Sequence, residues 1–245
     1  MDLGLKNKTA LIMGSTSGLG LAVAQLLSNE GVRVAICGTN PEKLEKAKIL
    51  THASFARQCD LNLPSAGSKL VEEVLQEFGS LDILVCNTGG PPKGKFLDIS
   101  QEQWTKGFQG LWMSAVDAMR ASIPQMQKNK WGRIVLVTSV AAKEAIQDLT
   151  ISNGFRAGLL GLTKSISNDV AGFGITVNAV LPGHTRTERL KALGVNESEI
   201  IQHIPARRLG EPEEFAALVG FLVSNQAGFI SGQAIAADGG AMKGF

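Results

Sequence analysis

A glycine-rich turn, Gly14-Ser15-Thr16-Ser17-Gly18-Leu19-Gly20, directly follows the apolar run Thr9–Met13 and opens a stretch of helical spacing over Leu19–Glu30. Glycine lets a backbone approach phosphate closely, and a helix N-terminus supplies unpaired N–H donors. The first strand-to-helix turn of a parallel sheet is where a dinucleotide places its pyrophosphate. An ordinary tight turn is the weaker interpretation. We therefore predict pyrophosphate contacts from Gly14, Ser15, Ser17, Gly18, Leu19 and Gly20.

The second predicted strand ends at Cys37-Gly38-Thr39-Asn40. About 20 residues beyond the glycine turn, an NAD-binding domain usually places Asp or Glu on the ribose 2′-hydroxyl. No carboxylate stands here to repel a 2′-phosphate, and Thr39 and Asn40 could donate to one, although no arginine is adjacent. The segment favours NADP(H) and leaves NAD(H) possible. The alternative is that Thr39 and Asn40 only begin a turn before Pro41.

Strands and helices alternate along the whole chain, which indicates right-handed βαβ units. Continuous apolar strands are typical of a parallel sheet covered on both faces. We predict an α/β fold, a single Rossmann-type doubly wound parallel sheet of about seven strands with helices on both faces. The expected strands are Thr9–Met13, Val32–Cys37, Ser54–Gln58, Ile83–Cys86, Ile134–Thr138, Thr176–Val180 and Ala234–Ala236.

Helical spacing marks the segments between the strands. Pro41, Pro64 and Pro212 are expected to open helices, because a missing N–H costs nothing at that position. Long helices are expected over Ser100–Asn129 and Thr150–Gly172. No linker divides the chain, so residues 1–245 are predicted to form one dinucleotide-binding domain. The irregular segment 184–208 is expected to be a flap over the substrate.

Composition excludes several other classes. Hydrophobic residues make up 44% and charged residues 19%, and the net charge of +2 comes without a basic run. This gives no reason to expect nucleic acid or a membrane surface as partner. No apolar run approaches the ~18 residues of a membrane span, and no leader opens the chain, so a cytoplasmic protein is expected. Three cysteines, Cys37, Cys59 and Cys86, exclude a full disulfide framework, and no metal-binding spacing joins them.

Over nearly its whole length the chain resembles the short-chain dehydrogenase/reductase family, and within it the 3-oxoacyl-[acyl-carrier-protein] reductase branch. The glycine turn resembles the family's Gly-x-x-x-Gly-x-Gly, and Cys86-Asn87-Thr88-Gly89-Gly90 resembles its Asn-Asn-Ala-Gly segment. Cys59-Asp60-Leu61 resembles the adenine-contacting segment, and Asn178 with Pro182–Thr187 resembles the nicotinamide-facing turn. The resemblance implies cofactor contacts from Asp60, Leu61, Asn87, Thr88, Gly89, Arg156, Pro182, Gly183, Thr185 and Thr187.

The catalytic positions depart from that family's pattern, which has a Ser after the fifth strand and a Tyr-x-x-x-Lys pair on the next helix. Ser139 fits, but Ser152 stands at the Tyr position and Arg156 at the Lys position, and the chain has no tyrosine. In the family, the phenol protonates the substrate oxygen while the lysine lowers its pKa. A serine hydroxyl is too weak an acid and too short. Arg156 is a poor proton donor but can bind ribose hydroxyls or an oxyanion.

Other side chains could replace the missing acid. Lys143 and Glu144 lie just beyond Ser139, although a solvated loop pair is the preferred interpretation. His184 could titrate near neutrality, or it could simply pack on the cofactor.

Three functions remain open. The chain is an oxidoreductase that reduces a carbonyl or a conjugated double bond with altered chemistry, an NADP(H)-binding sensor or partner-binding protein without turnover, or an oligomerisation scaffold. The scaffold ranks last because it would not need the retained cofactor motifs. The substrate is expected to be a small molecule or an acyl thioester.

The long helices carry apolar residues on more than one side, and one of those faces needs a cover. The resemblance implies a homotetramer or homodimer paired through them. The substrate pocket is expected to be lined by Pro91–Phe96, Ala141–Thr150 and His184–Ala206.

Overall fold

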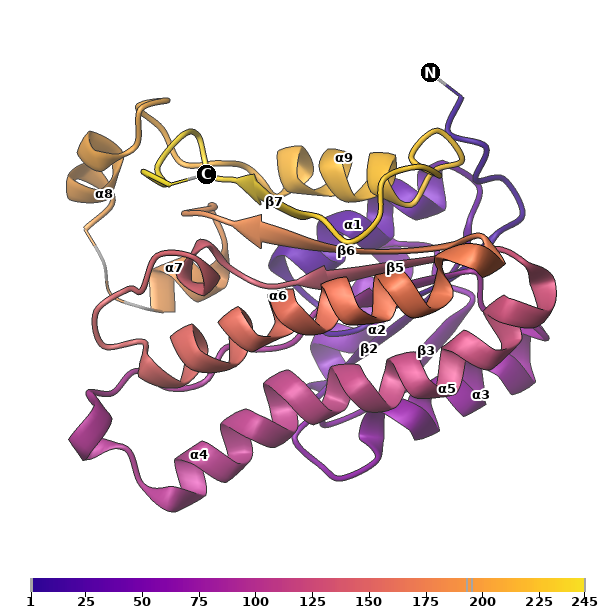
Figure 1. The fold of residues 1–245 in the computed structure, drawn as a ribbon, viewed down its shortest axis with the longest axis horizontal. Coiled ribbons are helices and arrows are strands. Elements are labelled where there is room, and N and C mark those ends of the chain that lie inside the picture. The colour runs from indigo at the N-terminus through magenta and orange to yellow at the C-terminus, as the bar shows by residue number, and fades with distance from the viewer. Residues whose placement is uncertain (1, 193, 195, 245) are drawn as a thin grey trace.

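The computed structural model describes residues 2–192, 194 and 196–244, which fold around a seven-stranded parallel sheet (Figure 1). The strand order is β3-β2-β1-β4-β5-β6-β7. The doubly wound α/β fold is confirmed, and each expected strand is present with its ends shifted by two residues at most. The strands are β1 (Thr9–Ile12), β2 (Arg33–Gly38), β3 (Phe55–Gln58), β4 (Ile83–Cys86), β5 (Gly132–Val137), β6 (Ile175–Pro182) and β7 (Ala234–Ala237).

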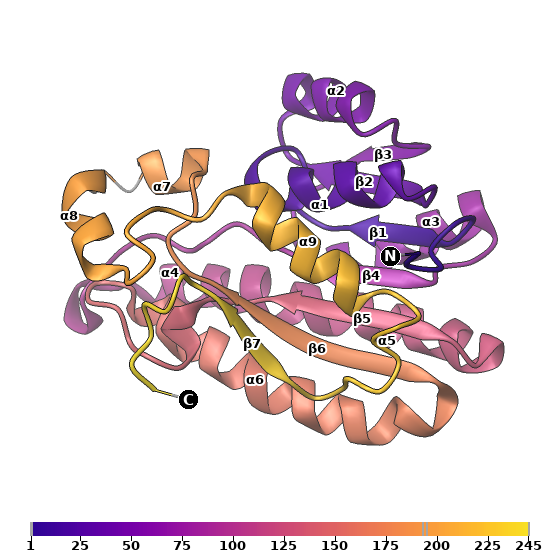
Figure 2. The same cartoon turned by 90° about the horizontal axis from the view of Figure 1, so that it is seen from above.

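Helices cover both faces of this sheet (Figure 2). Helices α1 (Gly18–Asn29), α2 (Pro41–Leu50) and α9 (Pro212–Leu222) pack on one face. Helices α3 (Ala66–Phe78), α5 (Ser114–Asn129) and α6 (Thr150–Val170) pack on the other. Three shorter helices, α4 (Gln101–Gly107), α7 (Glu188–Ala192) and α8 (Glu197–His203), lie toward the carboxyl ends of the strands.

The two hydrophobic layers follow from the pleat of the strands. Successive side chains of a strand point to opposite faces, so Ala10 and Ile12 enter the layer beneath α1 and α9. Leu11 and Met13 enter the layer beneath α3, α5 and α6. Because both faces are covered, β1 is apolar at every position after Thr9 and its four residues are buried.

The sheet changes direction of winding at β1, which pairs with β2 on one side and with β4 on the other. In an open α/β sheet, ligands bind outside the carboxyl ends of the strands at such a switch point. The fold therefore places the glycine turn after β1 and the Asn87 segment after β4 side by side.

Two expected helices differ from the structure. Helix α3 begins at Ala66 rather than at Pro64, because Ser65 takes a left-handed conformation with φ 60°. The helix expected over Ser100–Asn129 is divided by a π-helical segment, Phe108–Met113, between α4 and α5. Within this segment Gly110 lies against Asn62: a Cβ at Gly110 would be 2.4 Å from the Asn62 Oδ1 atom.

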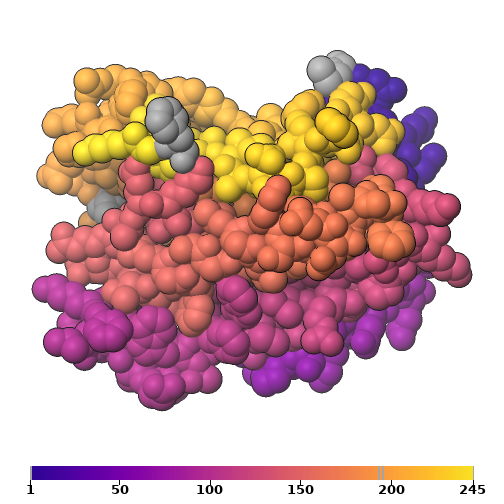
Figure 3. Space-filling view, in the orientation of Figure 1, coloured from indigo at the N-terminus to yellow at the C-terminus, as the bar shows by residue number. Residues whose placement is uncertain are grey.

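Figure 3 shows the surface that α4, α5 and α6 form together. Trp112, Met113, Val116 and Leu160 are half-buried there, and Phe173 is 43% exposed. Among the described helices, none is both long and apolar enough to cross a membrane. The predictions for residues 1–245 and 184–208 include positions 1, 193, 195 and 245, which lie outside the described residues.

Candidate active site

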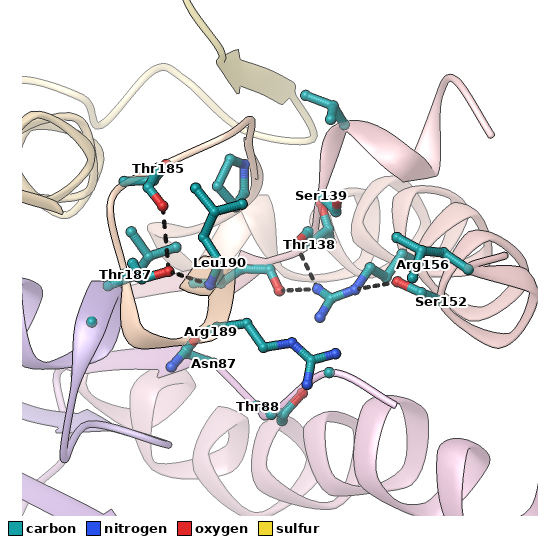
Figure 4. Close-up of a pocket in the computed structure, with 18 of the residues that line it drawn as sticks. Asn87, Thr88, Thr138, Ser139, Ser152, Arg156, Thr185, Thr187, Arg189 and Leu190 are labelled. Carbon is teal, nitrogen blue, oxygen red and sulfur yellow. Dashed lines mark hydrogen bonds between the residues drawn. The ribbon is translucent and has the colours of Figure 1, made fainter. Parts of the chain in front are cut away.

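A pocket of about 520 Å³ opens at the carboxyl ends of the strands (Figure 4). It is built from the turn after β1, the segment after β4, the end of β5, the start of α6 and the segment after β6. Most of the predicted site residues line it together: Gly14, Ser17, Gly18, Leu19, Asn87, Thr88, Gly89, Ser139, Ser152, Arg156, Pro182, Gly183, His184, Thr185 and Thr187.

The glycine turn forms one wall of this pocket. Gly14 and Gly18 both have φ of +55°, a conformation that residues with a Cβ rarely adopt. Ser17 occupies the N-cap position of α1, but its side chain makes no capping hydrogen bond. The first N–H groups of α1 thus face the pocket without a side-chain cap, which is what an anion-binding helix N-terminus requires.

Ser15 and Gly20 support the turn from behind instead of lining the pocket. The Ser15 side chain is fully buried, donates to the Ile12 carbonyl and accepts the Cys37 N–H. A Cβ at Gly20 would lie 2.4 Å from the Gly14 carbonyl oxygen. These two residues therefore support the shape of the turn.

Asn87 ties the turn to the neighbouring strand. Its Nδ2 donates to the carbonyls of Gly14, at 2.8 Å, and Met13, at 3.3 Å. Thr187 approaches the turn from the opposite side, since a Cβ at Gly18 would be 3.3 Å from its Cγ2 atom. The segments after β1, β4 and β6 thus converge on one space, as the sequence predicted.

The residues expected around the adenosine lie outside this pocket. Thr39 and Asn40 are exposed, and Asn40 caps α2 by accepting the Lys43 N–H, which agrees with the alternative of a turn before Pro41. Asp60 accepts from the backbone and side chain of Asn62. Leu61 lines a second pocket of about 220 Å³ that shares Thr88, Gly89, Gly90 and Pro91 with the first.

Ser152 and Arg156 lie one helical turn apart on α6 and are buried together (Figure 4). The Arg156 Nε donates to the Ser152 Oγ at 3.1 Å, and its Nη1 donates to the carbonyls of Val137 and Thr138 at 3.0 and 2.5 Å. The end of β5 therefore fixes the guanidinium, and its Nη2 points into the pocket. Burial, with a smaller contribution from Arg189, lowers the pKa of Arg156 to about 10, so it stays charged near neutral pH.

Ser139 lies two residues beyond the end of β5, at the edge of the same pocket. Its Oγ accepts the Ala141 N–H at 3.1 Å and so caps the short 3-10 turn Val140–Ala142. A serine hydroxyl that accepts one hydrogen bond still has its own proton to donate. Ser139 can therefore serve both the local capping role and a ligand in the pocket.

The three candidate proton donors separate in the structure. His184 lines the pocket, and burial lowers its pKa, so it is mostly neutral near pH 7. Lys143 is exposed and lies outside the pocket lining. Glu144 accepts the backbone N–H groups of Lys243 and Gly244, so it holds the C-terminal segment rather than a substrate.

Arg189 was not identified from the sequence, although it lies within the predicted flap. It belongs to α7, lines the pocket, and its Nη2 donates to the Pro91 carbonyl at 2.9 Å. Arg186, three residues earlier, instead pairs with Glu197 and Glu211. Spacing within an irregular segment carries no signal that separates these two arginines.

Comparison with known proteins agrees with this geometry. The sequence model of the family described as enoyl-(acyl carrier protein) reductase matches residues 14–242. Dehydrogenase/reductase SDR family member 4 of Oryctolagus cuniculus is 35% identical over 246 residues, covering 97% of this chain and 94% of that protein. The chain belongs to the short-chain dehydrogenase/reductase family. The 3-oxoacyl-[acyl-carrier-protein] reductase FabG of Rickettsia felis is also 35% identical, over 97% of this chain and 98% of its own length.

Solved structures of short-chain dehydrogenase/reductases share the fold closely. YwfH, described as an NADPH-dependent reductase involved in bacilysin biosynthesis, has a TM-score of 0.93 and 30% identity over 98% of this chain and all of its own. L-Sorbose reductase from Gluconobacter frateurii, solved with NADPH and L-sorbose, has a TM-score of 0.92 and 28% identity over both full chains. These neighbours are oxidoreductases, as the sequence predicted for this chain.

Proposed function

We propose that this protein is an NADP(H)-dependent reductase that adds hydride to a conjugated double bond or to a carbonyl group. The observation that carries the proposal is that an uncapped helix N-terminus and the fixed guanidinium of Arg156 open into one pocket. The first is suited to a dinucleotide phosphate, and the second to a developing negative charge. Bound NADPH supplies the hydride.

The residues present fit this cofactor. Gly89 lines the pocket, and no atom lies within 4 Å of the position its Cβ would take, so the space beside it is open. The end of β2 has no carboxylate to repel a 2′-phosphate. Lys43, in the first turn of α2, has its ammonium 2.6 Å from the exposed Glu188 carboxylate and could exchange that partner for phosphate. The NADPH named for YwfH and L-sorbose reductase further supports NADP(H) over NAD(H).

Arg156 and Ser139 are the groups proposed to polarise the substrate. Three hydrogen bonds hold the Arg156 guanidinium at the end of β5, so little reorganisation is needed when charge develops near Nη2. Fixed donors of this kind stabilise an oxyanion more than mobile water does. The Ser139 hydroxyl can add a neutral donor from the same strand end.

The missing phenol bears on which bond is reduced. At position 152, where the family has tyrosine, the Ser152 hydroxyl accepts a hydrogen bond from Arg156 and is 7% exposed. Losing a positioned acid typically costs ~10²–10⁴ in rate. Hydride addition to a conjugated double bond develops charge on a distant oxygen, which a permanent cation can stabilise while water delivers the proton. We therefore propose the conjugated double bond as the favoured substrate group.

A second function is an NADP(H)-binding sensor or partner-binding protein without turnover. The observation that favours it is that His184, which lines the pocket, has its pKa lowered by burial, so near pH 7 its imidazole is mostly unprotonated and has no extra proton to donate. Such a protein would bind NADPH tightly and consume none of it with any acceptor.

NADPH oxidation tests these proposals. The absorbance of NADPH is followed with enones, quinones and 3-oxoacyl thioesters as acceptors. A reductase consumes NADPH with an enone, and Arg156→Met lowers that rate at least tenfold while NADPH still binds. The double variant Ser152→Tyr, Arg156→Lys restores the family pair and is expected to shift preference toward 3-oxoacyl thioesters. Tight binding with no consumption by any acceptor would replace the reductase proposal with the sensor.

We also propose that the chain forms a homotetramer or homodimer. Phe96 is 66% exposed and packs edge-on against Trp104, which packs against Phe155 of α6. This aromatic surface over α4 and α6 adds to the half-buried apolar side chains of α5. Light scattering after size-exclusion chromatography is expected to give a multiple of the 25.9 kDa chain mass, and a monomer would reject it.

A further inference from the structure

The pocket carries more positive charge than the proposed reaction needs. Two arginines, Arg156 and Arg189, are among its described lining residues, while Glu188 is the one carboxylate among them. The Glu188 carboxylate pairs with the Lys43 ammonium at 2.6 Å and with neither arginine. Within the described residues, no ion pair joins Arg156 or Arg189 to a carboxylate.

Arg156 and Arg189 reach the same space from opposite walls (Figure 4). Arg156 comes from α6, and its partners among the described residues are neutral groups, namely two carbonyls and a serine hydroxyl. Arg189 comes from α7 and is bound to a third carbonyl, that of Pro91. Its guanidinium lies over Gly90, whose Cβ would be 2.6 Å from the Nη2 atom.

Two other arginines among the described residues, Arg133 and Arg207, also bind backbone carbonyls, but neither lines the pocket. Arg57 pairs with Glu73, Arg186 with two glutamates, and Arg208 with Glu214. The arginines of these ion pairs are exposed, as Arg189 also is, and an exposed ion pair is worth little. The two pocket arginines have carbonyl partners instead, which leaves their charge available to a ligand. Planar guanidinium groups bind carboxylates with paired hydrogen bonds.

We infer that the substrate is an anionic acid, an unsaturated or oxo acid whose carboxylate binds Arg189 while its reacting π-system lies beside Arg156. This inference rests on the proposed reductase function and names its substrate class. Val140, Ile146, Leu149 and Leu190 also line the pocket, so the rest of the substrate is expected to include an apolar part.

The cofactor's phosphates are the other oxyanions that Arg189 could bind. Arg189 donates to the carbonyl of Pro91, which directly follows the segment Asn87–Gly90. Pro91 and most of that segment also line the second pocket. The two sources of an oxyanion make different predictions for the Arg189→Met variant, which keeps most of the side-chain length and removes the charge.

Calorimetric titration of the NADPH-loaded protein with trans-cinnamate and with cinnamamide tests the inference. The two probes share shape and conjugation and differ in charge. We expect cinnamate to bind roughly tenfold more tightly than cinnamamide, since a hydrogen bond to a charged group is worth more than one to a neutral group. Arg189→Met is expected to abolish that difference while the Kd of NADPH stays unchanged. Arg120→Met removes a charge from the exposed face of α5 and is expected to preserve the difference.

Equal affinity for acid and amide, or no saturable binding of cinnamate, would overturn the inference. A tenfold rise in the Kd of NADPH for Arg189→Met, with the acid preference intact, would also overturn it and assign Arg189 to the cofactor. Titration of the protein with NADPH alone separates the two levels of proposal. Failure of NADPH to bind removes the proposed function, whereas loss of acid preference in a protein that binds NADPH removes only the substrate class.

Discussion

Gly20→Ala is a direct test of how the cofactor turn is built. Gly20 lies in the first turn of α1, behind the glycine turn. An added Cβ would lie 2.4 Å from the Gly14 carbonyl oxygen, 2.8 Å from the Asn87 Nδ2 and 2.9 Å from the Ser15 Cα. Two of these atoms are backbone, so no side-chain rotation can relieve the overlap. The turn has to move away from the helix.

The size of the effect follows from what must move. Overpacking of this kind costs about 1–3 kcal/mol. The Asn87 side chain would lose or weaken its hydrogen bonds to Gly14 and Met13, each worth about 1 kcal/mol. Alanine has a better helix propensity than glycine, which offsets about 1 kcal/mol of this loss of stability. A net loss of about 2–4 kcal/mol corresponds to a melting temperature lower by roughly 5–15 °C for a chain of this length.

Thermal unfolding and fluorescence titration with NADPH measure the two expected consequences, lower stability and an affinity reduced at least tenfold. Gly161→Ala is the matched control. Gly161 lies in α6 with no heavy atom within 4 Å of its Cβ position, so alanine there is expected to stabilise by about 0.5–1 kcal/mol. A melting temperature for Gly20→Ala within about 2 °C of the natural protein, with unchanged NADPH affinity, would refute the reasoning.

Two further predictions concern ionisable groups. Burial raises the pKa of Cys37 and Cys86 to about 12. At pH 8, iodoacetamide should therefore modify only the half-buried Cys59 until the protein unfolds, and mass spectrometry can follow the modification of each cysteine. Labelling of Cys37 or Cys86 in the folded protein would contradict the structure. Hydrogen bonding to Arg208 lowers the pKa of Glu214 to about 2, below its ordinary value of 4.5. The stability from this carboxylate is present above pH 4.5 and lost as the pH falls toward 2. Glu214→Gln should therefore flatten acid unfolding over that window, and an unchanged pH profile would count against the pair.

The alternation of apolar strands with helical spacing was enough to predict the seven-stranded sheet, since both signals are local. The long-range consequence, that the turns after β1, β4 and β6 meet, followed from the parallel topology. Local signals were less reliable at helix ends. Helix α3 begins two residues after Pro64, because the left-handed Ser65 intervenes. The π-helical segment before α5 had no predicted counterpart.

Residue types and order in the sequence thus determined the fold, the family and most of the pocket lining. Tertiary structure decided what each side chain does there. The Ser15 hydroxyl accepts the N–H of Cys37 in β2, and the Glu144 carboxylate accepts the N–H of Lys243 in the C-terminal segment. Arg189 entered the pocket while Arg186 paired with surface carboxylates. Sequence spacing cannot make that choice, because a side chain's partners in a loop come from segments far away along the chain, and only the packed fold brings them within reach.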